Sequence, residues 1–381
     1  MVVRHLTLVG LGAMGLAAGR RRIPGAVMSF SSPICMPLLA ALLLSPMAAV
    51  GQQASPSSPP MKVRTGPMPR TIHLDVVVTS KPGEVVRGLE QKDFTVVDDK
   101  TPREITSFEE VDGSKQPVQA ILLIDAVNVG YTEISQERTQ IDKFLKMNGG
   151  RLALPTALAV FGDQGIKMQG AYSRDGNALA DSLAKYTISL RAIGRSAGVE
   201  GAEERLNDSL KAIRMLAAYE AGRPGRKIIL WVSPGWPLLS GPRVNLTDNQ
   251  REAIFQEVTW LSTTLREAQT SVYAVNPLGV GESVQEAFYY ELFTGGVKKA
   301  NDVSMGNLGL QVIAGETGGL VRNSTDVSGL LQECVEDNVA YYRLSFEPPP
   351  TEKREVYHSL KVAVARVGAT ISTSTGYYDE P

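Results

Sequence analysis

The sequence predicts an α/β fold, a doubly wound and mainly parallel sheet with a small β domain built from both flanking segments. Continuous apolar runs with β-branched residues, at 118–126, 156–163, 226–234 and 270–277, are typical of strands covered on both faces. Amphipathic helical sequence lies between them: Ile254, Val258, Leu261 and Leu265 follow spacings of four, three and four. Strands that alternate with helices in this way predict parallel pairing.

Residues 1–51 have the features of a secretory signal and leader. Arg20, Arg21 and Arg22 precede an apolar stretch at 37–50 that is too short to span a bilayer comfortably. The small residues Ala49 and Gly51 stand where a signal peptidase would cut. The pattern predicts an exported protein that is periplasmic, envelope-associated or secreted, and it leaves the start open between Met1 and Met28.

The same leader contains Gly10, Gly12 and Gly15, which match the spacing of a dinucleotide-binding turn. That turn needs an acidic residue about 20 positions later to hold the ribose hydroxyls. The first acidic residue of the chain is Asp75, so we predict no dinucleotide cofactor.

Composition restricts the partners of the mature chain. The formal charge of the whole chain is −1, and residues 1–51 contain four Arg and no acid, so the mature charge is −5. A mildly acidic surface argues against nucleic acid or anionic membrane as the main partner. We expect no membrane span in the mature chain.

Cys334 is the one cysteine outside the predicted signal, so it has no second cysteine with which to form a disulfide within the mature chain, and it is predicted to be a buried helix thiol.

The mature chain divides into four parts. Residues 52–70 are rich in Pro and Ser and are typical of a linker. Alternating apolar residues at 72–80, 93–99 and 103–111 predict an N-terminal β segment, residues 71–116. The α/β domain covers 117–338, and a C-terminal β segment covers 339–381. Each β segment is too small for a core of its own, so we expect the two to pair with each other.

Three stretches together resemble a known family: "LDVVVTSKPGEVVRGLEQKDFTVVDDKTPREITSFEEV", "AILLIDAVNV" and the terminal "YYRLSFEPP…YHSLKVAVARVGATISTSTGYY". They are similar to the bacterial, acidobacterial-type von Willebrand factor A-related domain family, over about residues 72–378. The resemblance implies a von Willebrand factor A-like fold whose sheet edge binds protein ligands, often through a divalent metal.

The metal-ion-dependent adhesion site of that family is degenerate in this sequence. The family motif Asp-x-Ser-x-Ser reads Asp125-Ala126-Val127-Asn128-Val129, and valine offers no oxygen to Mg²⁺. The later threonine is missing, and Ser233 stands where an aspartate is expected. Asp125 is the one matching ligand and a weak metal candidate. We expect no metal of the standard kind, and we interpret Asp125 as a carboxylate that accepts backbone N–H groups at a strand-to-helix turn.

The function predicted from these features is an exported, non-enzymatic protein–protein interaction module. Its ligand-binding edge would contain Asp125, Asn128, Ser233 and Trp236, at the carboxyl ends of the strands, where open α/β sheets bind ligands. Its partner would be another envelope or extracellular protein. One alternative is a metal-dependent adhesion-type domain with nonstandard ligands, in which Mg²⁺ would be the cofactor.

A second alternative is a serine hydrolase. "GRSAG", residues 194–198, matches a nucleophile elbow, with Ser196 as nucleophile and His358 as the only downstream histidine. A glycine-rich loop explains the same residues, and no triad is evident from the sequence, so no catalytic residue is predicted.

Overall fold

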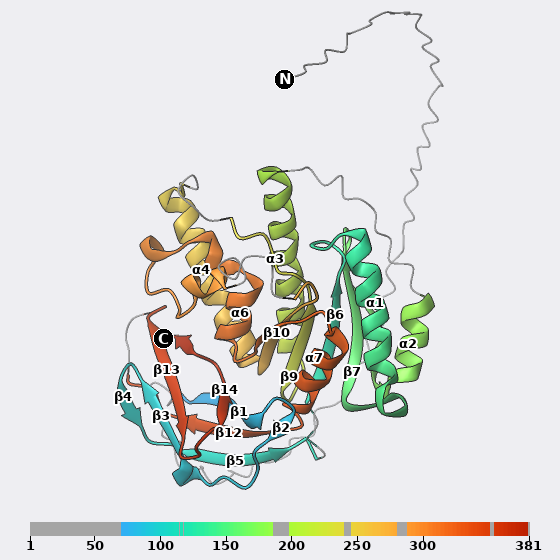
Figure 1. Cartoon of the computed structure of the whole chain (residues 1–381). Helices are drawn as coiled ribbons and strands as arrows, with labels where there is room; N and C mark the ends of the chain where they lie inside the picture. Colours follow the sequence, from blue (N-terminus) through green and yellow to red (C-terminus); the bar gives the residue numbers. More distant parts are fainter. Residues whose placement is uncertain are drawn as a thin grey trace, which may run out of the picture. The chain divides into compact units, whose positions relative to one another are not determined.

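Fifteen strands in three sheets and six α-helices make up the described part of the chain (Figure 1), which is residues 70–379 except 114, 117, 186–197, 240–244, 280–287 and 351–353 of a computed structural model. The predicted leader, residues 1–51, and nearly all of the predicted linker lie outside the described residues.

The six-stranded sheet is mixed and has the order β11-β10-β9-β6-β7-β8. Its strands are β6 (Gln119–Asp125), β7 (Arg151–Gly162), β8 (Gly165–Asp175), β9 (Lys227–Val232), β10 (Thr270–Asn276) and β11 (Val321–Asn323). Alternate residues of β6 enter two different hydrophobic cores, with Leu122 and Ile124 on one face and Ile121 and Leu123 on the other. Because both faces are covered, the strand sequence is apolar throughout.

Helices cover both faces of this mixed sheet (Figure 1). One face carries α1 (Tyr131–Lys146), α2 (Gly176–Lys185) and α7 (Val327–Glu336); the other carries α3 (Val199–Ala221), α4 (Asp248–Glu267) and α6 (Leu310–Glu316). The predicted stripe of α4 is confirmed, since its four residues are buried. Short 3-10 helices connect the elements: η1 (Gln91–Asp93), η2 (Met147–Gly150), η3 (Tyr289–Phe293), η4 (Ala300–Asp302) and η5 (Met305–Leu308).

The chain ends contribute two antiparallel sheets. The five-stranded sheet holds β1 (Ile72–Lys81), β2 (Glu84–Val85), β5 (Ser107–Asp112), β12 (Ala340–Phe346) and β14 (Thr370–Ser372). The four-stranded sheet holds β3 (Phe94–Asp98), β4 (Thr101–Arg103), β13 (Tyr357–Val364) and β15 (Gly376–Tyr378). They share one core and curl around it as a half-barrel.

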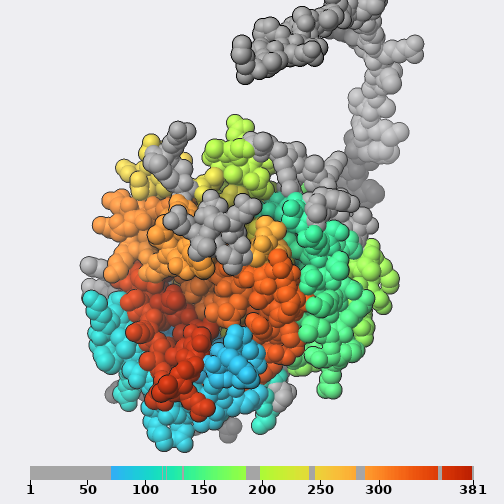
Figure 2. Space-filling view, in the orientation of Figure 1, coloured from blue at the N-terminus to red at the C-terminus, as the bar shows by residue number. Residues whose placement is uncertain are grey.

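Strands from the two flanking segments pair directly, as expected. β1 lies between β12 and β14, and β3 pairs with β13. Figure 2 shows the last strands, in red, against the first, in blue. Alternate side chains of β1, Ile72, Leu74, Val76 and Val78, fill the shared core, which accounts for the period of two in the sequence.

The predicted fold class, a doubly wound and mainly parallel sheet of the von Willebrand factor A type, is wrong. Five of the fifteen described strands run parallel; β8 is antiparallel to β7, and the remaining nine form the two antiparallel sheets. The β7–β8 connection contains only Asp163 and Gln164, and a parallel crossover needs a dozen residues or more. The hairpin therefore makes the central sheet mixed, and the flanking segments contribute most of the strands.

Cys334 is fully buried on α7 beneath the mixed sheet, so the prediction of a buried helix thiol is confirmed. Burial raises the pKa of the Cys334 thiol to about 12. At neutral pH the thiol is therefore protonated and serves as a small apolar side chain in the core.

Candidate functional site

Asp125 ends β6 at the carboxyl edge of the mixed sheet and is completely buried. Its Oδ1 accepts hydrogen bonds from the backbone N–H groups of Val127 and Asn128, both at 2.9 Å. Its Oδ2 accepts from the Asn128 side-chain amide at 2.8 Å and from the Trp231 indole at 3.0 Å. Burial raises the pKa of Asp125, although hydrogen bonds from Asn128, Trp231 and Ser233 act to lower it. The carboxylate thus organises the turn between β6 and α1.

The residues around Asp125 do not fit a magnesium ion. Both carboxylate oxygens already face N–H donors, and a donor hydrogen repels a cation placed on the same lone pair. Val127 and Val129 are buried and offer no side-chain oxygen where the related motif has serine. Mg²⁺ needs nearly octahedral oxygen ligation, which this turn does not provide.

The other residues of the predicted ligand-binding edge pack inside the protein around Asp125. Asn128 bonds to Asp125 and donates to Ser209 on α3 at 3.0 Å. Ser233 is buried and accepts from the Gly235 N–H at 3.1 Å. Trp236 is 4% exposed and meets Trp231 edge to face, with ring centroids 5.0 Å apart. The structure brings the four residues together, but as an internal support for the edge.

A groove lies on the outside of the same edge, between α3 and α4. It consists of two adjoining hollows of about 380 Å³ and about 390 Å³, which share Asn207 and Met305. We define the α3–α4 groove by the residues that line these hollows: Val199, Glu203, Leu206, Asn207, Leu210, Lys211, Arg214, Leu239, Asn245, Leu246, Gln250, Ala253, Ile254, Glu257, Met305 and Leu308.

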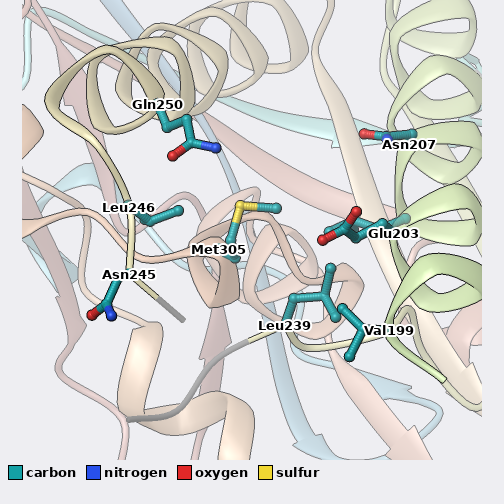
Figure 3. A pocket seen from close by; sticks show the side chains of 9 residues that line it. Val199, Glu203, Asn207, Leu239, Asn245, Leu246, Gln250 and Met305 are labelled. Atoms are coloured by element: carbon teal, nitrogen blue, oxygen red, sulfur yellow. The ribbon is translucent and has the colours of Figure 1, made fainter. Parts of the chain in front are cut away.

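Figure 3 shows the side chains that line the hollow of about 380 Å³. Val199, Glu203 and Asn207 extend from α3, Gln250 from the first turn of α4, and Met305 from η5 in the middle. Leu239 and Leu246 complete an apolar floor between the two helices. The polar groups stand at the rim, so the hollow combines an apolar interior with hydrogen-bonding edges, as ligand sites usually do.

Large apolar side chains are exposed on the same two helices. Val199 is 67% exposed at the start of α3, and Met215 and Tyr219 are 55% and 47% exposed near its end. Trp260 on α4 is 40% exposed, with the Arg214 guanidinium 5.8 Å from its ring centroid. Trp260 contacts Arg214, which lines the groove, whereas Met215 and Tyr219 are not among the lining residues. An exposed aromatic side chain beside an apolar hollow is typical of protein-binding surfaces.

A second polar cluster lies in the four-stranded antiparallel sheet, around His358 of β13. Its Nδ1 lies 3.1 Å from Asp98 Oδ1 and 3.2 Å from Asp99 Oδ2, and its Nε2 lies 3.0 Å from Asp379 Oδ2. Asp98 is fully buried, although it directly precedes the turn between β3 and β4. Arg103 and the Tyr377 hydroxyl also donate to Asp98.

Asp98, Asp99 and His358 have the donor types and spacing of a metal site. The oxygens of Asp98 are already engaged in hydrogen bonds, however, because Asp98 accepts from Arg103, Tyr377 and His358. His358 also stacks on Tyr377 at 4.8 Å, which fixes its ring. The arrangement fits an ion-pair cluster that fastens β3, β13 and the C-terminal end together.

The hydrolase alternative finds no support in this cluster. Ser196 lies outside the described residues. Both ring nitrogens of His358 face carboxylates, so neither is left to accept a proton from a serine hydroxyl.

The chain matches no family model and no curated protein. Among solved structures, it is similar to the N-terminal domain of TFIIH p34, with 13% sequence identity, a TM-score of 0.26, and coverage of 57% of this chain and 96% of that chain. A TM-score this low supports no inference about fold or function. Among the described helices, none combines the length and apolar character needed to cross a membrane.

Proposed function

We propose that the protein is an exported, non-enzymatic module that binds another envelope or extracellular protein through the α3–α4 groove. The observation that supports this most is the position of the groove: an apolar hollow with a polar rim, open beside the carboxyl edge of the mixed sheet. Asp125, Asn128, Ser233 and Trp236 would hold this edge rigid, and the groove would make the contact.

The chemistry of the groove indicates the kind of partner segment. Leu206, Leu239 and Met305 offer apolar surface to one or two aliphatic or aromatic side chains. Glu203 and Lys211 lie about two turns apart on α3 and place opposite charges along the groove, with Lys211 also bonded to Asp208 at 3.0 Å. An amphipathic segment with apolar anchors at helical spacing fits such a groove between two helices.

Val199→Asp should abolish most of the binding. Peptides selected from a random 12-residue display library on the full chain are expected to carry apolar anchors. Their dissociation constants, measured by fluorescence anisotropy, should rise at least tenfold on Val199→Asp, about 1.4 kcal/mol. The substitution places an acid in the first turn of α3, where the helix dipole favours it, so folding should be unaffected.

The matched control is Val367→Asp, since Val367 is fully exposed between β13 and β14, on a different sheet. Its peptide affinity should stay within about twofold of wild type. Leu246→Asp, inside the groove, should reproduce the loss. Selected peptides that bind Val199→Asp and Leu246→Asp as tightly as wild type would show that the groove is not the site.

Export has its own test, which does not depend on the groove. Protein isolated from the envelope of the native host should begin near Gln52, as Edman sequencing or intact mass would show. Recovery of residues 1–51 on the envelope protein would contradict the proposed signal.

Covalent labelling of Ser196 by a fluorophosphonate probe would contradict the non-enzymatic part of the proposal.

A further inference from the structure

A cavity of about 240 Å³ lies on the opposite face of the mixed sheet from the α3–α4 groove. Glu133, Glu137 and Gln140 of α1 form one wall of this cavity. Pro277 and Leu278, which follow β10, and Val327, at the start of α7, form the other. We call it the Glu137 cavity.

Glu137 occupies a position in α1 where the helical period calls for an apolar residue. Ile134 and Ile141, three residues before it and four after it, face the core and are fully buried. Glu137 itself is 1% exposed, and neither of its carboxylate oxygens has a hydrogen-bond partner among the residues that the structure describes. An ionisable side chain buried without a partner is unfavourable for folding, so the position points to a ligand.

The charges around Glu137 are mainly negative. Glu133 lies one turn earlier on α1, and Asp125 ends the neighbouring strand β6; burial first, and then both of these charges, raise the pKa of Glu137 to about 9. The cations of α1 are engaged elsewhere: Arg138 donates to the Leu183 carbonyl, and Lys143 lies 3.6 Å from Asp326, the N-cap of α7. Within the described residues, no cation pairs with Glu137.

Glu137 and Gln140 line the cavity, and their buried oxygens without a partner among the described residues, the two of Glu137 and the amide oxygen of Gln140, are all acceptors once Glu137 is ionised. A ligand must therefore bring hydrogen-bond donors, and a cation would also complement the carboxylate. The facing wall is apolar, and Leu278 is half exposed, which leaves room for an alkyl chain to enter. Mg²⁺ keeps several waters in its coordination shell, and the apolar side chains of Pro277, Leu278 and Val327 would offer those waters no hydrogen bonds.

We infer that the Glu137 cavity binds a primary ammonium group on an alkyl chain, either a free amine or the side chain of a partner's lysine. The ammonium would donate to both oxygens of Glu137 and to Gln140, and the chain would pack against Pro277, Leu278 and Val327. Binding at neutral pH converts the neutral carboxyl of Glu137 into a carboxylate and releases its proton to the buffer.

Calorimetric titration of the full chain with n-butylammonium chloride, at pH 7.5 and constant ionic strength, tests this. Titrations in phosphate and in HEPES, whose ionisation enthalpies differ and neither of which carries a primary ammonium group, should show the release of about one proton for each amine bound, because burial and the nearby carboxylates raise the pKa of Glu137 to about 9. Butan-1-ol, which has the chain without the charge, should not bind. Capped lysine that binds tighter than butylammonium would indicate a protein partner as the source.

Glu137→Gln should lower the affinity for butylammonium at least tenfold and eliminate the proton release. Asp142→Asn is the matched control: it removes a negative charge from α1 outside the cavity, where Asp142 pairs with Lys146, and should keep the affinity within about threefold, and circular dichroism should show both variants folded. Equal binding to wild type and Glu137→Gln, binding without proton release, or a response to Mg²⁺ in place of the amine would each overturn the inference.

Discussion

Asp125→Ala should lower the free energy of unfolding by about 3–5 kcal/mol, as measured by urea denaturation at pH 7. The substitution leaves four N–H donors without their acceptor: the backbone groups of Val127 and Asn128, the Asn128 side chain and the Trp231 indole. Each buried donor left unpaired costs about 1–3 kcal/mol, and water entering the gap offsets part of the total.

The loss should be equal in Mg²⁺ and in chelator, because the structure gives Asp125 hydrogen bonds and no ligand set for an ion. Asp181→Ala, at an exposed position of α2, is the control and should change the stability by less than about 0.5 kcal/mol. If Mg²⁺ stabilised wild type and had no effect on Asp125→Ala, the adhesion-type alternative with nonstandard ligands would be correct.

A chain that ends at Pro348 should fail to give a stable monomer. The truncation removes β13, β14 and β15, and with them one of the three partners of β1 and one of the two partners of β3. It also removes Leu360, Val362 and Tyr377 from the half-barrel core. The exposed edges of β1 and β3 would be open to pairing between chains, so light scattering should show aggregates.

A chain that ends at Asp379 is the control for that experiment. It keeps the contacts of Asp379 with Arg70 and His358, and it should remain monomeric and fully protected against amide exchange in residues 72–98. If the Pro348 truncation also stayed monomeric and kept that protection, the half-barrel would not depend on the C-terminal strands.

Local pattern was enough to predict many elements of this fold. The apolar run at 118–126 becomes β6, buried on both faces, and the stripe from Ile254 to Leu265 becomes the buried face of α4. Whether neighbouring strands pair parallel or antiparallel was harder to predict from the sequence. The run after Gly162 could be recognised as a strand, but two connecting residues decide that it returns antiparallel, which periodicity alone does not reveal.

The site shows the same division between local and long-range information. The hydrogen bonds that Asp125 accepts from the backbone N–H groups of its own turn were expected from its place at a strand-to-helix junction. Its bond to Trp231 joins residues 106 positions apart, and no pattern in the sequence predicts it. The α3–α4 groove is likewise assembled from α3, α4 and η5, which meet only in the folded chain.

For Glu137, by contrast, the sequence does contain a signal of an unusual position. A carboxylate between Ile134 and Ile141, on the apolar stripe of a helix, contradicts the pattern of its neighbours. Such local conflicts concentrate at functional positions, and this one could have been found by inspecting each predicted stripe for a charged residue. Its place in the wall of a cavity, with both oxygens unpaired among the described residues, needed the structure.

Amide hydrogen exchange of the full chain, free and bound to the tightest selected peptide, tests the proposed function most directly. The account predicts slower exchange confined to the start of α3, residues 199–210, and to residues 245–254 at the start of α4, which line the groove. Val199→Asp should lose this protection at the same peptide concentration. Protection that instead covers the half-barrel strands, or that persists unchanged in Val199→Asp, would contradict the α3–α4 groove as the binding surface.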